Sequence, residues 1–135
     1  MKRHGGLWEP MLEWENFLLA ARKAERGKRD CLYARRFRFD LEKELWRLRE
    51  ELLDDSYRPG LFSTHWITRP KPRLISAAPF RDRVVHHLLM NVLEPVFERH
   101  MHPDSYACRK GKGTHAAADR LQALMRRLGH DEDWK

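Results

Sequence analysis

The fold of this chain depends most on residues 70–120, which read PKPRLISAAPFRDRVVHHLLMNVLEPVFERHMHPDSYACRKGKGTHAAADR. In this stretch two clusters of cations flank one apolar segment, and a turn with two glycines precedes a second segment of helical periodicity. The apolar residues after position 83 form a broad face that predicts a helix. We expect Pro95 to interrupt this helix, because its ring clashes with a continuing helix. Cations on a rigid support indicate a partner that carries phosphates.

A β-hairpin is predicted directly before this helix. Residues 61–68 are rich in aromatic and β-branched side chains, which favours a strand, and residues 73–76 supply a second strand. Two prolines confine the junction between them to a loop or a sheet edge. In this junction Arg69, Lys71 and Arg73 alternate, so an extended backbone would place them on one face, where they could bind one polyphosphate. A solvated edge turn explains the prolines but not this alternation.

Three other stretches have the apolar periodicity of amphipathic helices. One helix is predicted over residues 9–26, and a second helix carries an apolar stripe from Phe37 and ends near Leu53. A last helix is predicted to begin with Thr114 as its N-cap, and its apolar side chains are expected to face inward. These are Ala116, Ala117, Leu121, Leu124, Met125 and Leu128. The chain is therefore predicted to have an α+β fold that is predominantly helical, with one short antiparallel β-hairpin.

Composition favours a single domain with a polyanionic partner. The chain has 135 residues, enough for one modest core, and its 27 Lys and Arg outnumber 20 Asp and Glu to give a net charge of +7. Nucleic acid is the default polyanion for such a chain. A charged fraction of 35% also suits a merely soluble helical protein, so the total charge does not decide between these alternatives. The clustering of the cations favours a nucleic-acid partner.

Cysteine usage and hydropathy indicate a cytoplasmic protein without a membrane segment. Cys31 and Cys108 lie far apart, and the N-terminus has no secretory signal pattern, so a disulfide is not expected. No apolar run approaches the ~20 residues that span a bilayer.

A second candidate phosphate site lies at residues 109–114, which read RKGKGT. The glycines let backbone N–H groups turn toward an anion just before a helix N-terminus, which predicts a phosphate cradle. The spacing is not that of a P-loop. Between the two cation clusters, Arg81 and Arg83 flank Asp82 at the predicted start of the central helix. Asp82 suits the helix dipole and is predicted to be structural, whereas the arginines either pair with it or contact a nucleic-acid backbone.

No catalytic or metal-binding residue is predicted in this chain. The histidines and cysteines match no common four-ligand zinc spacing. Asp54 and Asp55 lie at a predicted helix end, and the acidic residues 131–133 lie near the C-terminus, so neither group supports a two-metal centre.

Two segments resemble the first fingers blocks of prokaryotic reverse transcriptases. They read PKPRLISAAPFRDRVVHHLLMNVLEPVFE (70–98) and SYACRKGKGTHAAADR (105–120). The similarity is closest to the group II intron-like branch, especially to enzymes of diversity-generating retroelements, and covers about residues 35–128. It implies part of a right-hand polymerase that copies RNA into DNA with two Mg²⁺ ions. Its partners would be an RNA template, an RNA/DNA hybrid and dNTP.

The resemblance also implies roles for individual residues. Lys71 and Arg73 match the cations that embrace the triphosphate of the incoming nucleotide. Ser105, Tyr106 and the basic residues after them match the part that lies along the template, and the RDR element matches the junction between fingers and palm. Together with Arg69, the residues expected to contact nucleic acid are Arg81, Arg83, Tyr106, Arg109, Lys110 and Lys112.

The resemblance ends where the palm of such a polymerase would begin. It implies an N-terminal helical segment over residues 1–34, the fingers region over residues 35–130, and the start of a junction to a missing palm over residues 131–135. No aromatic-x-Asp-Asp motif occurs, so the catalytic aspartates are missing, Mg²⁺ is expected only for a complete polymerase, and activity of this chain alone is not expected. Three interpretations stay open: polymerase fingers truncated before the palm, a subunit that docks onto a separate palm, or a stand-alone basic RNA-binding or assembly module.

Overall fold

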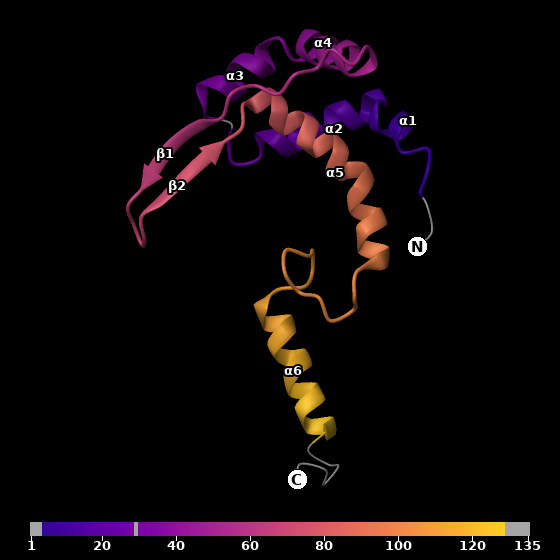
Figure 1. The fold of residues 1–135 in the computed structure, drawn as a ribbon, viewed down its shortest axis with the longest axis vertical. Coiled ribbons are helices and arrows are strands. Elements are labelled where there is room, and N and C mark those ends of the chain that lie inside the picture. Colours follow the sequence, from indigo (N-terminus) through magenta and orange to yellow (C-terminus); the bar gives the residue numbers. More distant parts are fainter. Residues whose placement is uncertain (1–3, 29, 129–135) are drawn as a thin grey trace. The chain divides into compact units, whose positions relative to one another are not determined.

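The computed structural model describes residues 4–28 and 30–128 and shows an α+β fold that is mostly helical (Figure 1). The helices are α1 (Trp8–Met11), α2 (Trp14–Glu25), α3 (Leu32–Phe39), α4 (Leu41–Leu53), α5 (Phe80–His100) and α6 (Thr114–Leu128). The strands are β1 (Ser63–Ile67) and β2 (Arg73–Ala77). The predicted fold class and the predicted hairpin are therefore confirmed. The residues of the predicted palm junction, 131–135, lie outside the described part.

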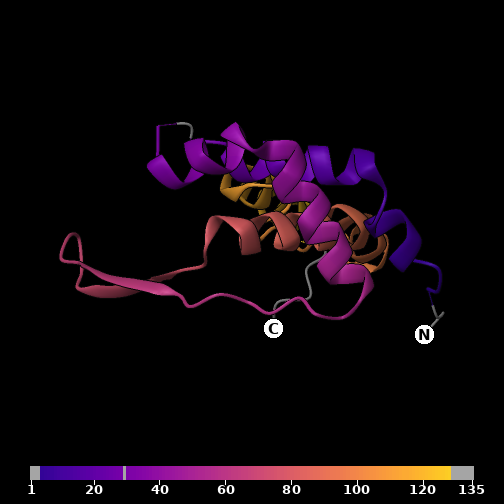
Figure 2. The same cartoon turned by 90° about the horizontal axis from the view of Figure 1, so that it is seen from above.

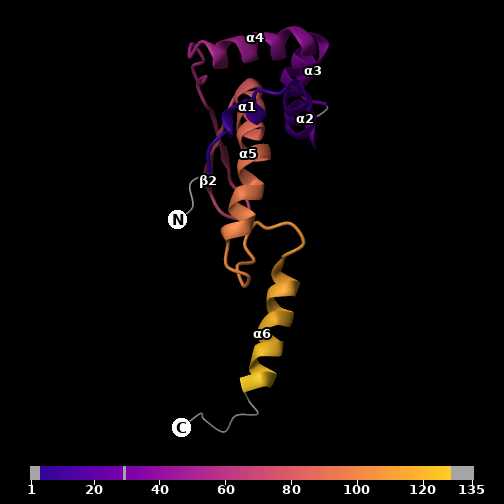
Figure 3. The same ribbon diagram turned by 90° about the vertical axis from the view of Figure 1, so that its right-hand side faces the viewer.

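The described residues form two units, one that ends at Val96 and one that begins at Phe97. In the first unit α1 to α4 gather around the first part of α5, and α4 lies across the N-terminal end of α5 (Figures 1 and 3). The largest fully buried side chains of the core are Phe17, Leu45, Leu48, Val84 and Leu88. They come from α2, α4 and α5, so these three helices form the centre of the core.

The N-terminal helix predicted as one element is divided into α1 and α2, so that prediction was wrong. Glu13 has an extended backbone, with φ −64° and ψ 139°, and the carbonyls before it lose their helical partners. Side chains from α2 and α4 replace these backbone hydrogen bonds. Asn16 Nδ2 donates to the carbonyl of Met11 at 2.9 Å, and Arg49 Nε donates to the carbonyl of Leu12 at 3.1 Å. Periodicity alone does not reveal such replacements.

A second break separates α3 from α4. The predicted helix ends at Leu53 as expected, but Asp40 leaves the helical region, so Phe37 belongs to the separate helix α3. Phe37 and Ala34 are buried on α3. The two helices continue one apolar stripe in the sequence, which is why the stripe predicted a single element.

Helix α5 continues through Pro95, contrary to the predicted interruption. A proline removes one backbone N–H donor, but the turns on both sides can keep a long helix continuous. None of the helices in the part of the chain that the structure describes is both long and apolar enough to cross a bilayer.

The prediction that the apolar side chains of α6 face inward was also wrong. No residue of α6 is buried, and Leu121 and Met125 are 59% and 63% exposed. A periodic apolar stripe identifies a helix and its apolar face, but it does not show whether another element covers that face.

The hairpin extends away from the helices of the first unit (Figure 2). Its strands are antiparallel, and the register pairs Ser63 with Ala77, Trp66 with Leu74 and Ile67 with Arg73. Every residue of β1 is exposed. The hairpin therefore adds little to the core, and its placement depends on how its two ends are attached to the helices.

Candidate nucleic-acid interface at the hairpin

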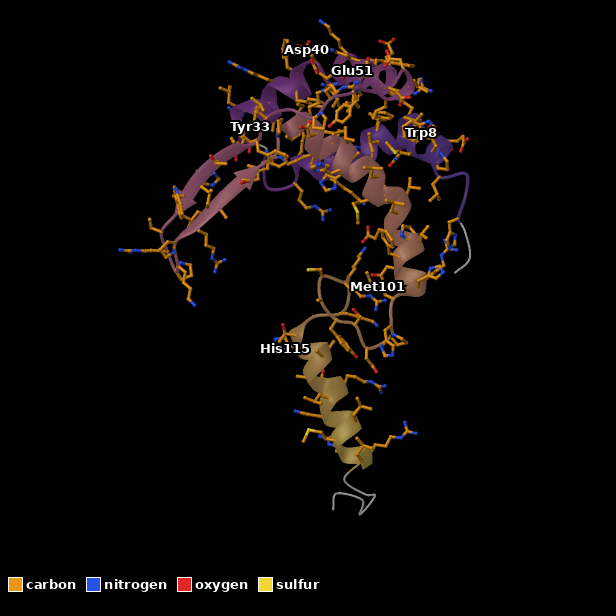
Figure 4. The ribbon with its side chains drawn as sticks, viewed as in Figure 1. Trp8, Tyr33, Asp40, Glu51, Met101 and His115 are labelled. Atoms are coloured by element: carbon orange, nitrogen blue, oxygen red, sulfur yellow. The ribbon has the colours of Figure 1, made fainter. Side chains whose placement is uncertain are left out.

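Three predicted phosphate-binding cations lie at the far end of the hairpin. Arg69 and Lys71 belong to the loop, and Arg73 begins β2. The backbone bends at residues 69–71, and the Arg69–Pro70 peptide bond is cis, so the loop is not the extended segment that the alternation argument assumed. Nitrogen-bearing side chains nevertheless gather at this end of the hairpin (Figure 4).

These three cations are available to a ligand. Arg69, Lys71 and Arg73 are all exposed. None of their side chains forms a hydrogen bond or ion pair with any residue in the described ranges 4–28 and 30–128. An unpaired cation gives up no internal contact when it binds an anion, so the end of the hairpin can receive phosphates without disturbing the fold.

One buried carboxylate anchors both ends of the hairpin. Asp82 is 3% exposed and lies in the first turn of α5, shortly after β2. Its Oδ1 accepts a hydrogen bond from the hydroxyl of Tyr57 at 2.8 Å, and its Oδ2 accepts one from the backbone N–H of Gly60 at 2.8 Å. Tyr57 and Gly60 precede β1. The predicted structural role of Asp82 is confirmed, because one side chain joins the segments that enter and leave the hairpin.

The residues around Asp82 pack closely against one another. Burial, and then the hydrogen bond to Asp82, raise the pKa of Tyr57, so its hydroxyl stays a donor. A Cβ atom at Gly60 would lie 2.9 Å from Cγ of Pro79, closer than such atoms pack. Glycine is therefore required at position 60 by the close approach of the two segments rather than by an unusual backbone angle.

Arg81 attaches the base of the hairpin to α4. Its guanidinium forms an ion pair with Glu51 and lies over the ring of Tyr57, 5.5 Å from the centroid. Figure 4 shows Glu51 on α4. Burial, and then the charge of Arg47, lower the pKa of Arg81, although this group stays charged in proteins. Arg81 is thus engaged within the protein, and its predicted contact with nucleic acid stays a prediction.

Arg83 attaches the same region to α3. Its Nε donates to the carbonyl of Ala78 at 3.1 Å, and its guanidinium lies 5.2 Å from the ring centroid of Tyr33 and 5.9 Å from that of Phe80. Figure 4 shows Tyr33 on α3, near the base of the hairpin. Neither Arg81 nor Arg83 pairs with Asp82 in a hydrogen bond among the described residues. The RDR element therefore contacts α3, α4 and the segment before β1, and Arg81 and Asp82 share Tyr57 as a neighbour.

In the second unit, Arg109 organises the segment before α6. Its Nε and Nη2 donate to the carboxylate of Glu98, with the shortest distance 2.6 Å, and its Nη1 donates to the carbonyls of His102 and Ser105 at 3.0 and 3.1 Å. The hydrogen bond to Arg109 lowers the pKa of Glu98 and raises that of Arg109. Most donors of Arg109 are used within the protein, so its predicted template contact stays a prediction.

The glycine-flanked basic segment forms a tight turn. Lys112 N–H donates to the carbonyl of Arg109 at 3.2 Å, and Gly111 has a φ of +73°, as the third residue of a type II turn requires. Lys112 Nζ donates to the carbonyl of Pro103 and lies 5.4 Å from the ring centroid of Tyr106. Lys110 is exposed and has no side-chain partner among the described residues. Lys110 is therefore the member of this cluster that is available to a phosphate.

We expect Glu98→Gln to loosen this turn. The substitution removes the charge that holds Arg109, so hydrogen exchange at the Lys112 amide should become faster. In the unsubstituted chain the same loosening is expected at low pH. The pKa of Glu98 is lower in the folded than in the unfolded protein, so the stabilisation by its ionised carboxylate is fully present above the unfolded pKa. This stabilisation is lost as the pH falls through the folded pKa. Lys110→Ala is the control. Equal exchange in Glu98→Gln and the control would contradict this role.

Several residues of the hairpin base were not singled out by sequence reasoning. Tyr57, Gly60 and Glu51 were not among the residues predicted to form the site. Their partners lie 22 to 30 residues away along the chain, so no local pattern reveals them. A glycine directly after proline, as at position 60, was the one available signal, because it marks a turn.

The described part of the chain offers no site for the Mg²⁺ ions that the resemblance implies. No three His, Cys, Asp or Glu side chains among the described residues lie together as metal ligands. The described residues therefore do not fit this cofactor.

Comparison with known proteins identifies one distant relative. No protein-family model matches the chain. The chain is 30% identical over 89 aligned residues to nuclear intron maturase 2, mitochondrial, of Arabidopsis thaliana. This similarity covers 54% of the chain but only 12% of the maturase. It supports a distant relation between this chain and the maturase and reverse transcriptase family.

Proposed function

We propose that this chain binds template RNA and incoming dNTP as the fingers part of an RNA-directed DNA polymerase whose palm lies outside it. The observation that carries the proposal is the hairpin end, where Arg69, Lys71 and Arg73 are exposed and unpaired among the described residues. The distant relation to an intron maturase supports an RNA partner. Because the chain spans only 12% of that maturase, the catalytic steps of the polymerase are assigned to other parts.

The chemistry of the three side chains fits phosphate binding. A planar guanidinium presents a fork of donors that can grip two oxygens of one phosphate, whereas an ammonium acts as a compact charge. Two arginines and one lysine near a single loop can therefore hold a chain of phosphates in a fixed direction. Asp82 attaches the base of the hairpin to the core, which limits the entropy that is lost when the hairpin binds.

The test removes the three charges together. In the triple variant Arg69→Ala, Lys71→Ala, Arg73→Ala, the affinity for a fluorescent single-stranded RNA should fall at least tenfold in anisotropy titrations. The slope of log K against log salt should become shallower by about 2, because each phosphate contact contributes about 0.7. The control triple variant Arg22→Ala, Arg26→Ala, Lys43→Ala removes the same charge from exposed sites on α2, directly after α2 and on α4. Equal losses in both variants would contradict a hairpin site.

A dNTP titration distinguishes the polymerase fingers from a stand-alone RNA-binding module. Binding of a fluorescent dNTP that is lost in Lys71→Ala, Arg73→Ala supports the polymerase role. RNA binding at the hairpin without any dNTP binding supports the stand-alone RNA-binding module instead.

A further inference from the structure

One face of the hairpin carries a large aromatic side chain without an internal partner. Trp66 in β1 is 67% exposed, and Leu74, its cross-strand neighbour in β2, is 53% exposed. Alternation along the strands places Thr64 and Ser76 on the same face, so this face holds no charge. The ring of Trp66 makes no stacking or cation–π contact with any other residue in the described part of the chain.

Other tryptophans of the first unit are used differently. Trp14 stacks on Trp46 with 4.8 Å between the ring centroids, and Arg49 lies over the ring of Trp46 at 5.6 Å. These rings help to join α2 to α4, whereas Trp66 stabilises no packing of this kind. An exposed tryptophan on a projecting strand lowers solubility without a gain in stability, which favours a ligand that covers it.

The position of Trp66 limits what this ligand is. The next residue, Ile67, is paired with Arg73, and Arg69 follows three residues after Trp66. At ~3.3 Å per residue, the backbone of Trp66 lies within about 10 Å of the start of the loop that carries Arg69 and Lys71, whereas Arg73, paired with Ile67, lies on the opposite face of the hairpin from Trp66. A ligand that covers the ring therefore also meets positive charge. An aromatic surface beside cations is the combination that binds single-stranded nucleic acid, because bases stack on the ring while phosphates pair with the charges.

We propose that an unpaired base of single-stranded RNA stacks on Trp66 while neighbouring phosphates bind the loop cations Arg69 and Lys71. This inference rests on the proposed function and narrows its substrate to an unpaired strand. A base within a duplex is already stacked on both faces and cannot cover the ring. The charge of the hairpin end excludes a basic peptide as the preferred occupant, because like charges repel.

The experiment compares three oligonucleotides with three variants of Trp66 and its neighbour. The oligonucleotides are a single-stranded RNA, a single strand of equal length without bases, and an RNA duplex. Trp66→Ala should weaken binding of the single-stranded RNA by about 5- to 150-fold, the range measured for loss of one stacked base. Trp66→Phe should restore most of this loss, because a phenyl ring still stacks. Leu74→Ala is the control on the same face and should change binding less than twofold.

Binding of the other two oligonucleotides shows whether stacking is the cause. Trp66→Ala should leave the affinity for the duplex and for the strand without bases unchanged, because neither offers a free base to the ring. Equal losses on all three oligonucleotides would overturn the inference, since they would mean that the substitution disturbs the hairpin.

The two proposals fail in different ways. If the triple cation variant loses affinity for RNA while Trp66→Ala keeps it, the stacking site is wrong and the proposed function remains. If neither variant changes binding, both proposals are wrong. If a partner protein rather than RNA covers Trp66, Trp66→Ala should leave RNA binding unchanged.

Discussion

Asp82→Ala should lower the free energy of unfolding of the first unit by about 3–5 kcal/mol. The wild-type carboxylate is buried and accepts hydrogen bonds from Tyr57 and Gly60. The substitution leaves the half-buried hydroxyl of Tyr57 and the backbone N–H of Gly60 without their acceptor. Each hydrogen bond to a buried charge is worth about 1.5–3 kcal/mol, so the two together account for the expected loss.

Denaturant unfolding followed by circular dichroism measures this loss. Asp40→Ala is the matched control, because Asp40 is exposed and its side chain caps no helix, and it should change stability by less than about 0.5 kcal/mol. RNA affinity provides a second readout. If the hairpin is placed by Asp82, affinity should fall in Asp82→Ala under conditions where the helices remain folded. Similar stabilities of the two variants would mean that the hairpin does not depend on this carboxylate.

Leu48→Ala should destabilise the first unit by about 2–5 kcal/mol. Leu48 lies on α4, is 0% exposed, and belongs to the core cluster that joins α4 to α2 and α5. Truncation removes buried methyl groups and leaves a cavity that the surrounding helices fill only in part. Because α4 also carries Glu51, the partner of Arg81, a loosened α4 should release the base of the hairpin.

Leu53→Ala in the same helix is the control. Leu53 is 52% exposed, so the same change of residue type should cost less than about 1 kcal/mol. The comparison keeps helix propensity constant, since both substitutions place alanine in α4. Equal destabilisation by the two variants would mean that Leu48 is not part of the core.

Local patterns predicted the elements whose signals lie within a few residues. The strands were expected over residues 61–68 and 73–76 and occur at Ser63–Ile67 and Arg73–Ala77. The end of α4 at Leu53 was also predicted from the sequence, whereas Thr114 is the first residue of α6 rather than its predicted N-cap, because the carbonyl of Gly113 accepts the first helical hydrogen bond, from Ala117. The break at Glu13 was not predicted, because one of the hydrogen bonds that replace the helical ones comes from Arg49, which reaches the carbonyl of Leu12 only when α4 packs against α1 and α2.

The candidate site shows the same division between local and long-range information. Sequence identified Arg69, Lys71 and Arg73 as neighbours near one loop, and the structure shows them unpaired within the described residues. It also identified Arg81 and Arg109 as candidate contacts, but these pair with Glu51 and Glu98. Whether a surface cation is available depends on acidic partners that periodicity does not locate.

The order of residues therefore fixes the helical periodicity, the strand propensity, the turn-forming glycines and the excess of positive charge, since each is a property of neighbouring residues. The attachment of the hairpin through Asp82 depends on Tyr57 and Gly60, 25 and 22 residues away. The exposure of Trp66 likewise depends on the absence of a covering element among the described residues. Such contacts form only when distant segments are packed together, because hydrogen bonding and burial act over a few ångströms in space rather than along the chain.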